Sequence, residues 1–322
     1  MSALLFPGQG SQIVGMGSEF YNNFDCVKKI FNQADDKLDY PISKIILNGP
    51  ENELQLTKNT QPAILTVSYS IYKVLKNEFN FDLKSFKFFA GHSLGEYSAL
   101  VCAEGLNFED ALYLLHERGM SMQEAVPVGK GGMLAVLGTK FENVLELLKN
   151  AKNNDQIIKN DNSDGVCEIA NDNADGQVIV SGDIESIKTM QSIFKEKKIK
   201  SIPLKVSAPF HCSLMKTAAE TMREKINNTK FDKPLFDIVN NVTAEPENNS
   251  NKIKKLLIEQ IYSTVRWRES IINMSKMGVK NYVEIGPGKV LTGMVKRTTK
   301  NANCFSINSI ADIKNLEDEF KK

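Results

Sequence analysis

The sequence lacks any cysteine pattern typical of a disulfide framework or a zinc site. Its five cysteines are odd in number, lie scattered from Cys26 to Cys304, and form no C-x-x-C pair. We therefore expect no bound metal. With 322 residues, 42% of them hydrophobic, the chain has enough material for one large α/β domain, or for a main domain with a smaller one inserted.

The sequence also lacks an excess of charge and a long apolar run. Forty basic against thirty-nine acidic residues leave a formal charge of +1, which favours neither nucleic acid nor an anionic membrane as a partner. No apolar stretch approaches the ~18 residues that span a bilayer, and the apolar residues 3–6 are too few for the core of a signal peptide. We expect a cytoplasmic protein.

The most informative stretch of the sequence is FKFFAGHSLGEYSALVCAEG, at residues 86–105. Its order is a short apolar strand, a G-x-S-x-G turn and a helix, which is the context in which this motif carries a nucleophilic serine. Glycines on both sides permit a sharp, strained turn that holds Ser93 at the start of the helix. There the backbone N–H of Leu94 faces the group that Ser93 attacks.

A second turn-rich segment, residues 7–12, follows the first predicted strand and matches no phosphate-binding pattern. It could lend a second backbone N–H to an active site, although a plain connection between a strand and a helix explains it as well.

Histidine is scarce, so the base that Ser93 needs is chosen from only three candidates. His92 adjoins the serine, and we expect its side chain to point away from the attack. His116 lies beside apolar positions of a helix and is typical of a structural residue. His211 lies in a turn after a strand and follows the serine in the chain, so it is the predicted base. No acidic residue suits the third role, since Asp183 and Glu185 fall elsewhere; a carbonyl or an amide could orient His211 instead.

The apolar periodicity predicts an α/β protein. Strands are expected at 2–6, 88–90, 133–137, 166–170, 178–180, 202–206, 235–239 and 282–285. Helices are expected at 19–37, from 60 onward, and at 96–103, 108–125, 142–149, 184–197, 252–262, 267–276 and 289–297.

From residue 127 to residue 200 the predicted order is β-α-β-β-α-β, which is typical of a ferredoxin-like α+β unit, with an exposed loop at 150–165. We predict a small inserted domain at 127–200 and a large catalytic domain formed by 1–126 and 201–322.

Taken together, motifs spread along the whole chain resemble the malonyl-CoA:acyl carrier protein transacylase family. The matching segments are GHSLGEYSAL at 91–100, FPGQGSQ at 6–12, TQPAIL at 60–65, RGMSMQEAVP at 118–127, NDNADGQVIVSG at 171–182, SAPFHCSLMK at 207–216, QIYSTVRW at 260–267 and VEIGPGKVLTGMVKR at 283–297. The resemblance implies a hydrolase-like parallel-sheet core with the ferredoxin-like domain inserted, and an active site in the cleft between the two.

The resemblance also implies the role of each site residue. Ser93 would be acylated, His211 would be the general base, and the N–H groups of Gln9 and Leu94 would form the oxyanion hole. Arg118 would bind the malonyl carboxylate through its guanidinium, although by itself this residue could equally form a surface ion pair with Glu117 or Glu124. The remaining implied positions are Gln260, whose main-chain carbonyl would orient the histidine, and Asn173 and Gln177 at the edge of the cleft. One departure is Asp175, where relatives often carry proline.

The implied reaction moves a malonyl group from coenzyme A to the phosphopantetheine thiol of acyl carrier protein through a seryl acyl-enzyme, and it supplies fatty acid biosynthesis. It needs no cofactor, because the coenzyme A thioester is a substrate. A serine thioesterase or esterase, a transacylase of polyketide synthesis or malonate decarboxylation, and a scaffold that only docks carrier protein are the alternatives. We expect a monomer, and Phe210 fits a pocket for unbranched acyl groups.

Overall fold

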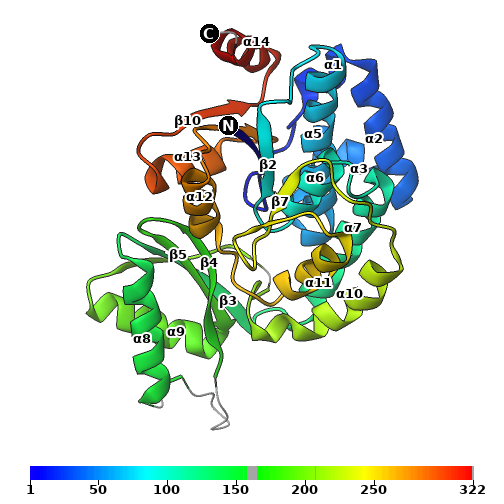
Figure 1. Cartoon of the computed structure of the whole chain (residues 1–322). Helices are drawn as coiled ribbons and strands as arrows, with labels where there is room; N and C mark the ends of the chain where they lie inside the picture. The colour runs from blue at the N-terminus through cyan, green and yellow to red at the C-terminus, as the bar shows by residue number, and fades with distance from the viewer. Residues whose placement is uncertain (155, 158–164, 207, 321–322) are drawn as a thin grey trace.

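The computed structural model describes residues 1–154, 156–157, 165–206 and 208–320, and it contains two β-sheets (Figure 1). The larger sheet is formed by β1 (Ser2–Phe6), β2 (Phe86–Gly91), β7 (Asp237–Val239), β8 (Pro246–Glu247), β9 (Asn281–Ile285) and β10 (Asn303–Ile307). The smaller sheet is formed by β3 (Gly131–Leu137), β4 (Cys167–Ala174), β5 (Gln177–Asp183) and β6 (Lys200–Pro203).

Helices cover both sheets (Figure 1). Around the larger sheet lie α1 (Ser18–Asn23), α2 (Asp25–Leu38), α3 (Ile42–Asn48), α4 (Glu51–Gln55), α5 (Thr57–Asn77), α6 (Gly95–Cys102), α7 (Phe108–Glu124), the 3₁₀ turn η1 (Ser213–Met215), α10 (Lys216–Asn228), α11 (Ser250–Gln260), α12 (Trp267–Lys276), α13 (Val290–Thr298) and α14 (Ile310–Phe320). Helices α8 (Phe141–Asn153) and α9 (Ile184–Glu196) accompany the smaller sheet.

The larger sheet has the order β10-β9-β1-β2-β7-β8, and only the short edge strand β8 is antiparallel to its neighbour. Its central strands are buried on both faces, which explains their nearly continuous apolar sequences. Successive side chains point to opposite faces: Leu4 and Phe6 join the core that includes α2, α5 and α7, whereas Ala3 and Leu5 join the core that includes Trp267 of α12.

The smaller sheet has the order β4-β5-β3-β6, with each neighbouring pair antiparallel. Leu134 and Val136 of β3 pack against residues of α8 and α9, whereas Met133 and Ala135 belong to the core cluster of the larger sheet. The β-α-β-β-α-β order and the α/β fold with a parallel core are therefore confirmed. Met133 and Ala135 thus lie on the face of this sheet that packs against the core of the larger sheet.

Several predicted boundaries are wrong. The helix expected at 19–37 is divided into α1 and α2 by Phe24, which has extended backbone. The strand expected at 202–206 is β6, which ends at Pro203. Not predicted were α3, α4, α10, α14, β8 and β10. Helix α8 continues to Asn153, into the loop expected at 150–165, of which residues 155 and 158–164 lie outside the described part. The domain limits 127–200, and 1–126 with 201–322, stay predictions.

The helix expected to open at Thr60 begins at Thr57 and contains Pro62. A proline inside a helix leaves the carbonyl four residues earlier without its N–H partner. Here that carbonyl belongs to Lys58, and His116 of α7 lies with its Nδ1 3.3 Å from the oxygen. His116 is half-buried and also contacts the Tyr40 hydroxyl at 3.4 Å, so it is a structural residue as expected.

No helix in the described ranges combines the length and the apolar character needed to cross a membrane.

The first prediction concerns a buried carboxylate of the smaller sheet. Asp183 caps α9 by accepting the N–H and the hydroxyl of Ser186, and it also accepts the N–H of Val166 at 2.6 Å. Asp183→Asn replaces an acceptor by a donor, so we expect the free energy of unfolding to fall by about 1–3 kcal/mol in urea titrations. Asp36→Asn, at an exposed position of α2, should change it by less than about 0.5 kcal/mol. Equal stabilities of the two variants would contradict the capping role.

Candidate active site

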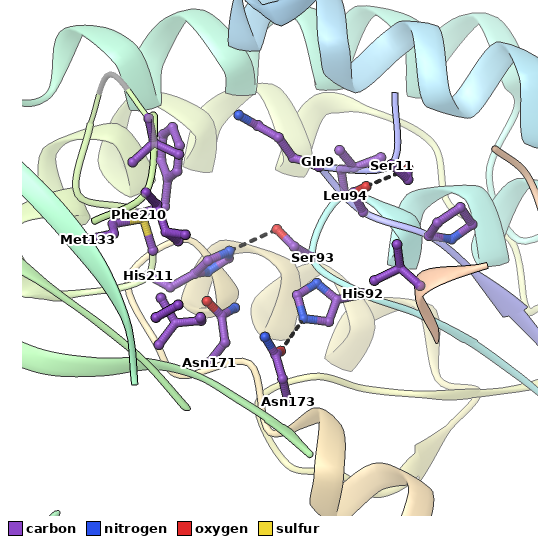
Figure 2. Close-up of a pocket in the computed structure, with 18 of the residues that line it drawn as sticks. Gln9, Ser11, His92, Ser93, Leu94, Met133, Asn171, Asn173, Phe210 and His211 are labelled. Atoms are coloured by element: carbon purple, nitrogen blue, oxygen red, sulfur yellow. Dashed lines mark hydrogen bonds between the residues drawn. The ribbon is translucent and has the colours of Figure 1, made fainter. Parts of the chain in front are cut away.

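A cavity of about 410 Å³ lies between the two sheets and gathers most of the predicted site residues. Its lining residues come from the loop after β1, the turn after β2, helices α5, α7 and α13, and residues 204–206 and 210–211. The smaller sheet contributes residues of β3, β4 and β5, including Asn171 and Asn173. Figure 2 shows the side chains of Ser93 and His211 pointing toward one another, joined by a hydrogen bond.

The G-x-S-x-G turn has the strained geometry that its sequence predicts. Ser93 has a φ of 53°, a conformation that costs energy for a residue with a β-carbon. The flanking glycines are required by close backbone contact: a β-carbon on Gly91 would lie 1.9 Å from the Gly95 carbonyl, and one on Gly95 would lie 2.2 Å from the Phe6 carbonyl oxygen. The turn thus brings α6 against β1 and presents Ser93, 9% exposed, to the cavity.

Ser93 and His211 are in hydrogen-bond contact, with 2.8 Å between Oγ and Nε2. The other ring nitrogen, Nδ1, lies 2.9 Å from the main-chain carbonyl of Gln260. Because a carbonyl can only accept, Nδ1 carries the proton, and Nε2 has the lone pair that accepts from the serine hydroxyl. The contact expected of Gln260 is present, and its role in orienting the histidine stays a prediction.

His211 also occupies a strained turn, with a φ of 59°. The turn is tied to the smaller sheet directly after the histidine, where Glu168 of β4 accepts the N–H of Ser213 at 2.8 Å and its hydroxyl at 2.6 Å. His211 is therefore bonded by Gln260 of α11, and the segment that follows it is bonded by Glu168 of β4.

Burial lowers the pKa of His211 to about 3, and the nearby Arg118 cation contributes in the same direction. The imidazole is therefore neutral at ordinary pH, as a general base must be. Burial also lowers the pKa of His92, the histidine beside the nucleophile.

Arg118 is 1% exposed, so the surface ion pair considered from the sequence is absent; Glu117 pairs instead with Lys225 at 3.0 Å. The guanidinium donates to Gln61 Oε1 at 2.7 Å, to Gln260 Oε1 at 3.0 Å and to Ser93 Oγ at 3.1 Å. Across the described ranges no carboxylate lies within ion-pair distance of it. A buried cation with three neutral partners is suited to bind an anion that enters the cavity.

Gln9 and Leu94 both line the cavity beside Ser93, as Figure 2 shows. Neither backbone N–H has a hydrogen-bond acceptor in the part of the chain that the structure describes. Two such donors beside a nucleophile are the arrangement that an oxyanion hole requires. Their role stays a prediction.

The side chain of His92 lines the cavity, where its Nε2 donates to Asn173 Oδ1 at 2.8 Å, whereas Ser93 Oγ is bonded to His211 (Figure 2). Asn173 lies at an irregularity of β4, where the pairing register with β5 shifts between Asp172 and Ala174. Gln177 also lines the cavity, and its Oε1 accepts from Arg297 at 2.6 Å. Phe210 lines the cavity as expected from its position beside the histidine.

Asp175, the departure in this segment, lies near Arg268, with 3.7 Å between Oδ1 and Nη1. The stronger partner of Arg268 is Asp172, at 2.9 Å.

Sequence reasoning missed three buried residues of this site: Gln61, Glu96 and Asn241. Glu96 was detectable in principle, because it is the one charged residue in the otherwise apolar and small helix α6, all of which is buried. Asn241 gives no local signal, since it meets Ser93 across 148 positions of sequence.

The second prediction follows from the low pKa of His211. An ordinary histidine loses about tenfold of its neutral form between pH 7 and pH 5.5, whereas His211, titrating near 3, should lose almost none. We therefore expect the ring nitrogen signals of His211 in NMR spectra to stay those of the neutral imidazole from pH 7 to pH 5.5. The low pKa also affects stability: because the unfolded chain binds a proton at its ordinary histidine pKa and the folded chain does not, His211 lowers the free energy of unfolding as pH falls from about 6.5 toward 3. A protonation midpoint near 6.5 for this ring in folded protein would contradict the low pKa.

Comparison with known proteins places this geometry in a family. The family model described as acyl transferase domain matches residues 3–321. The chain is 39% identical over 317 residues to the malonyl CoA-acyl carrier protein transacylase of Haemophilus influenzae, covering 98% of each chain. It is similar to the crystal structure of acyl-carrier-protein-S-malonyltransferase from Bartonella henselae, with a TM-score of 0.93, 36% identity, and coverage of 100% of this chain and 99% of that one.

A further similar structure is a malonyl-transacylase in complex with its type II PKS acyl-carrier protein, with a TM-score of 0.91, 36% identity and coverage of 99% of each chain. Matches of this identity over the full length, together with the serine turn and its histidine, show that the chain belongs to the malonyl CoA-acyl carrier protein transacylase family.

Proposed function

We propose that this protein transfers a malonyl group from coenzyme A to the phosphopantetheine thiol of acyl carrier protein through a seryl acyl-enzyme, and that it supplies fatty acid biosynthesis. One observation carries the proposal: Ser93 Oγ lies 2.8 Å from Nε2, the unprotonated ring nitrogen of His211, and 3.1 Å from Nη2 of Arg118. A nucleophile thus lies within reach of both a base and a buried cation without a carboxylate partner.

In the first half-reaction, Ser93 Oγ attacks the thioester carbonyl while its proton moves to His211 Nε2. The carbonyl oxygen becomes an oxyanion that the N–H groups of Leu94 and Gln9 stabilise. The C–S bond then breaks, the coenzyme A thiolate takes the proton from His211, and the malonyl ester remains on Ser93. The Gln260 carbonyl stabilises the imidazolium through Nδ1–H, which is the role that a carboxylate has in other serine enzymes.

In the second half-reaction the phosphopantetheine thiol enters the same cavity. His211 takes the thiol proton, the sulfur attacks the malonyl ester, and the tetrahedral intermediate expels Ser93 Oγ, which recovers its proton from His211. Ser93 and His211 therefore act in both half-reactions.

Arg118 explains why a dicarboxylic acyl group is the substrate. A malonyl carboxylate can form two parallel hydrogen bonds with a guanidinium, and a guanidinium in a buried site binds such an anion strongly. The Arg118 cation also lowers the pKa of His211. The bound carboxylate offsets that cation, so malonyl binding strengthens the base that the reaction uses.

Asn173 and Gln177 are proposed to contact the substrate at the edge of the cavity, where Phe210 favours unbranched acyl groups. The monomeric state, the cytoplasmic location and the absence of a cofactor stay predictions.

The proposal is tested by the kinetics of transfer between malonyl-CoA and holo-acyl carrier protein. A seryl acyl-enzyme predicts parallel double-reciprocal plots, because coenzyme A leaves before the carrier protein reacts. Transfer that requires both substrates together, or release of malonate that does not depend on carrier protein, would contradict the proposal; the second result would favour a thioesterase.

The third prediction tests the binding of the carboxylate. Arg118→Ala should lower kcat/KM for malonyl transfer on the order of 10²–10³-fold, because a charge-assisted bidentate pair is lost in a buried site. Acetyl transfer, which has no carboxylate to bind, should change less than about tenfold. Lys225→Ala is the matched control, because it removes a cation that contacts the same helix on its outer side, and it should leave both activities unchanged. Equal losses of malonyl and acetyl transfer in Arg118→Ala would contradict the assignment.

A further inference from the structure

A buried carboxylate beside the nucleophile has no role in this mechanism. Glu96, the second residue of α6, is fully buried, and its carboxylate accepts from Asn240 Nδ2, from Asn241 N at 3.1 Å and from Gln260 Nε2 at 2.7 Å. All three partners are donors, which matches an ionised carboxylate. Burial raises the pKa of Glu96 to about 7, and these donors and the Arg118 charge act in the opposite direction.

The first of these contacts leads to the nucleophile. Asn241, whose N–H is bound by Glu96, uses its own side chain to connect Gly91, the first residue of the serine turn, with Ser93. Its Oδ1 accepts the N–H of Ser93 at 2.7 Å, and its Nδ2 donates to the Gly91 carbonyl at 2.7 Å. Since Ser93 is held in a strained conformation, these two bonds fix the backbone at the residue whose orientation the chemistry needs.

The second contact leads to the base and to the cation. The main-chain carbonyl of Gln260 accepts from His211 Nδ1, and its side-chain Oε1 accepts from Arg118 Nη2 at 3.0 Å. Its Nε2 donates to Glu96 and also to the Ser93 carbonyl at 3.2 Å. Donors lie on one side and acceptors on the other, so the orientation of this amide follows from its partners.

The Gln260 amide therefore lies between a buried anion and a buried cation. Glu96 balances the charge of Arg118 without forming an ion pair with it, and this leaves the guanidinium able to bind a substrate carboxylate. A carboxylate in direct contact with Arg118 would occupy the same donors.

We propose that Glu96 is a positioning residue for acyl transfer, which acts through Asn241 and Gln260 to hold Ser93 and His211 in their reactive geometry. The inference deepens the proposed function and rests on it for the reaction. It also accounts for the missing third acid: the carboxylate is present, but it acts through the residue whose carbonyl holds the histidine.

The test measures how fast Ser93 reacts with two probes, diisopropyl fluorophosphate and malonyl-CoA, by intact mass of the whole protein at a temperature where each variant is folded. The fluorophosphate forms an O–P bond with an activated serine and releases fluoride, so it reports on Ser93 and His211 without a malonyl group. Glu96→Gln places an amide donor among three donors. We expect both reactions to slow at least about 30-fold, because small misplacements of reacting groups cost that much or more.

Asp183→Asn is the matched control, because it neutralises another buried carboxylate that accepts three hydrogen bonds and does not line the cavity. It should react with both probes within about twofold of the wild-type rate, although it is less stable. Glu96→Asp keeps the charge and should recover part of the loss. Where Glu96→Gln does not fold, Glu96→Asp serves as the test, and we expect it to react at least about fivefold more slowly than wild type.

If folded Glu96→Gln reacted at wild-type rates, the inference would be overturned and Glu96 would be a purely structural residue. The same holds for Glu96→Asp where Glu96→Gln does not fold. Equal slowing in Asp183→Asn would overturn it as well, since the loss would then follow stability alone. A wild type that the fluorophosphate labels but malonyl-CoA does not would contradict the proposed function; slow labelling of Glu96→Gln would still support the role of Glu96.

Discussion

The close approach of α6 to β1 at the serine turn is the constraint on which the rest of this site depends. No β-carbon fits at Gly91 or Gly95, and Ser93 between them has a strained backbone conformation. The surrounding structure must supply the energy that holds it. It does so with an apolar core on both faces of the parallel sheet and with the two hydrogen bonds that the Asn241 side chain makes with Gly91 and Ser93.

Charge imposes the second constraint, because the site buries both Arg118 and Glu96. Isolated charges in an apolar interior are strongly unfavourable, and a direct ion pair would leave no cation for a substrate. An amide between them satisfies both requirements. The low pKa of His211 is a consequence of the same arrangement, since burial and the Arg118 cation both disfavour the imidazolium.

Local signals in the sequence were sufficient for the serine turn, the histidine and the positions of the central strands, because glycine spacing and apolar runs act over a few residues. They were not sufficient where contacts between distant segments determine the structure. Pro62 lies inside α5, where His116 of another helix contacts the carbonyl that the proline leaves unpaired. The hydrogen-bond partner of His92 is Asn173 of the smaller sheet, 81 positions away in the sequence. The links from Glu96 to Asn241 and Gln260 span more than 140 residues and have no local pattern.

The most direct test of the account is the intact mass of the protein within seconds of mixing with malonyl-CoA alone, beside Ser93→Ala. The account predicts an increase of one malonyl group in the wild type, located on the peptide that contains Ser93, and no increase in the variant. An adduct that persists in Ser93→Ala, or one located on another residue, would contradict a mechanism that begins at the serine turn.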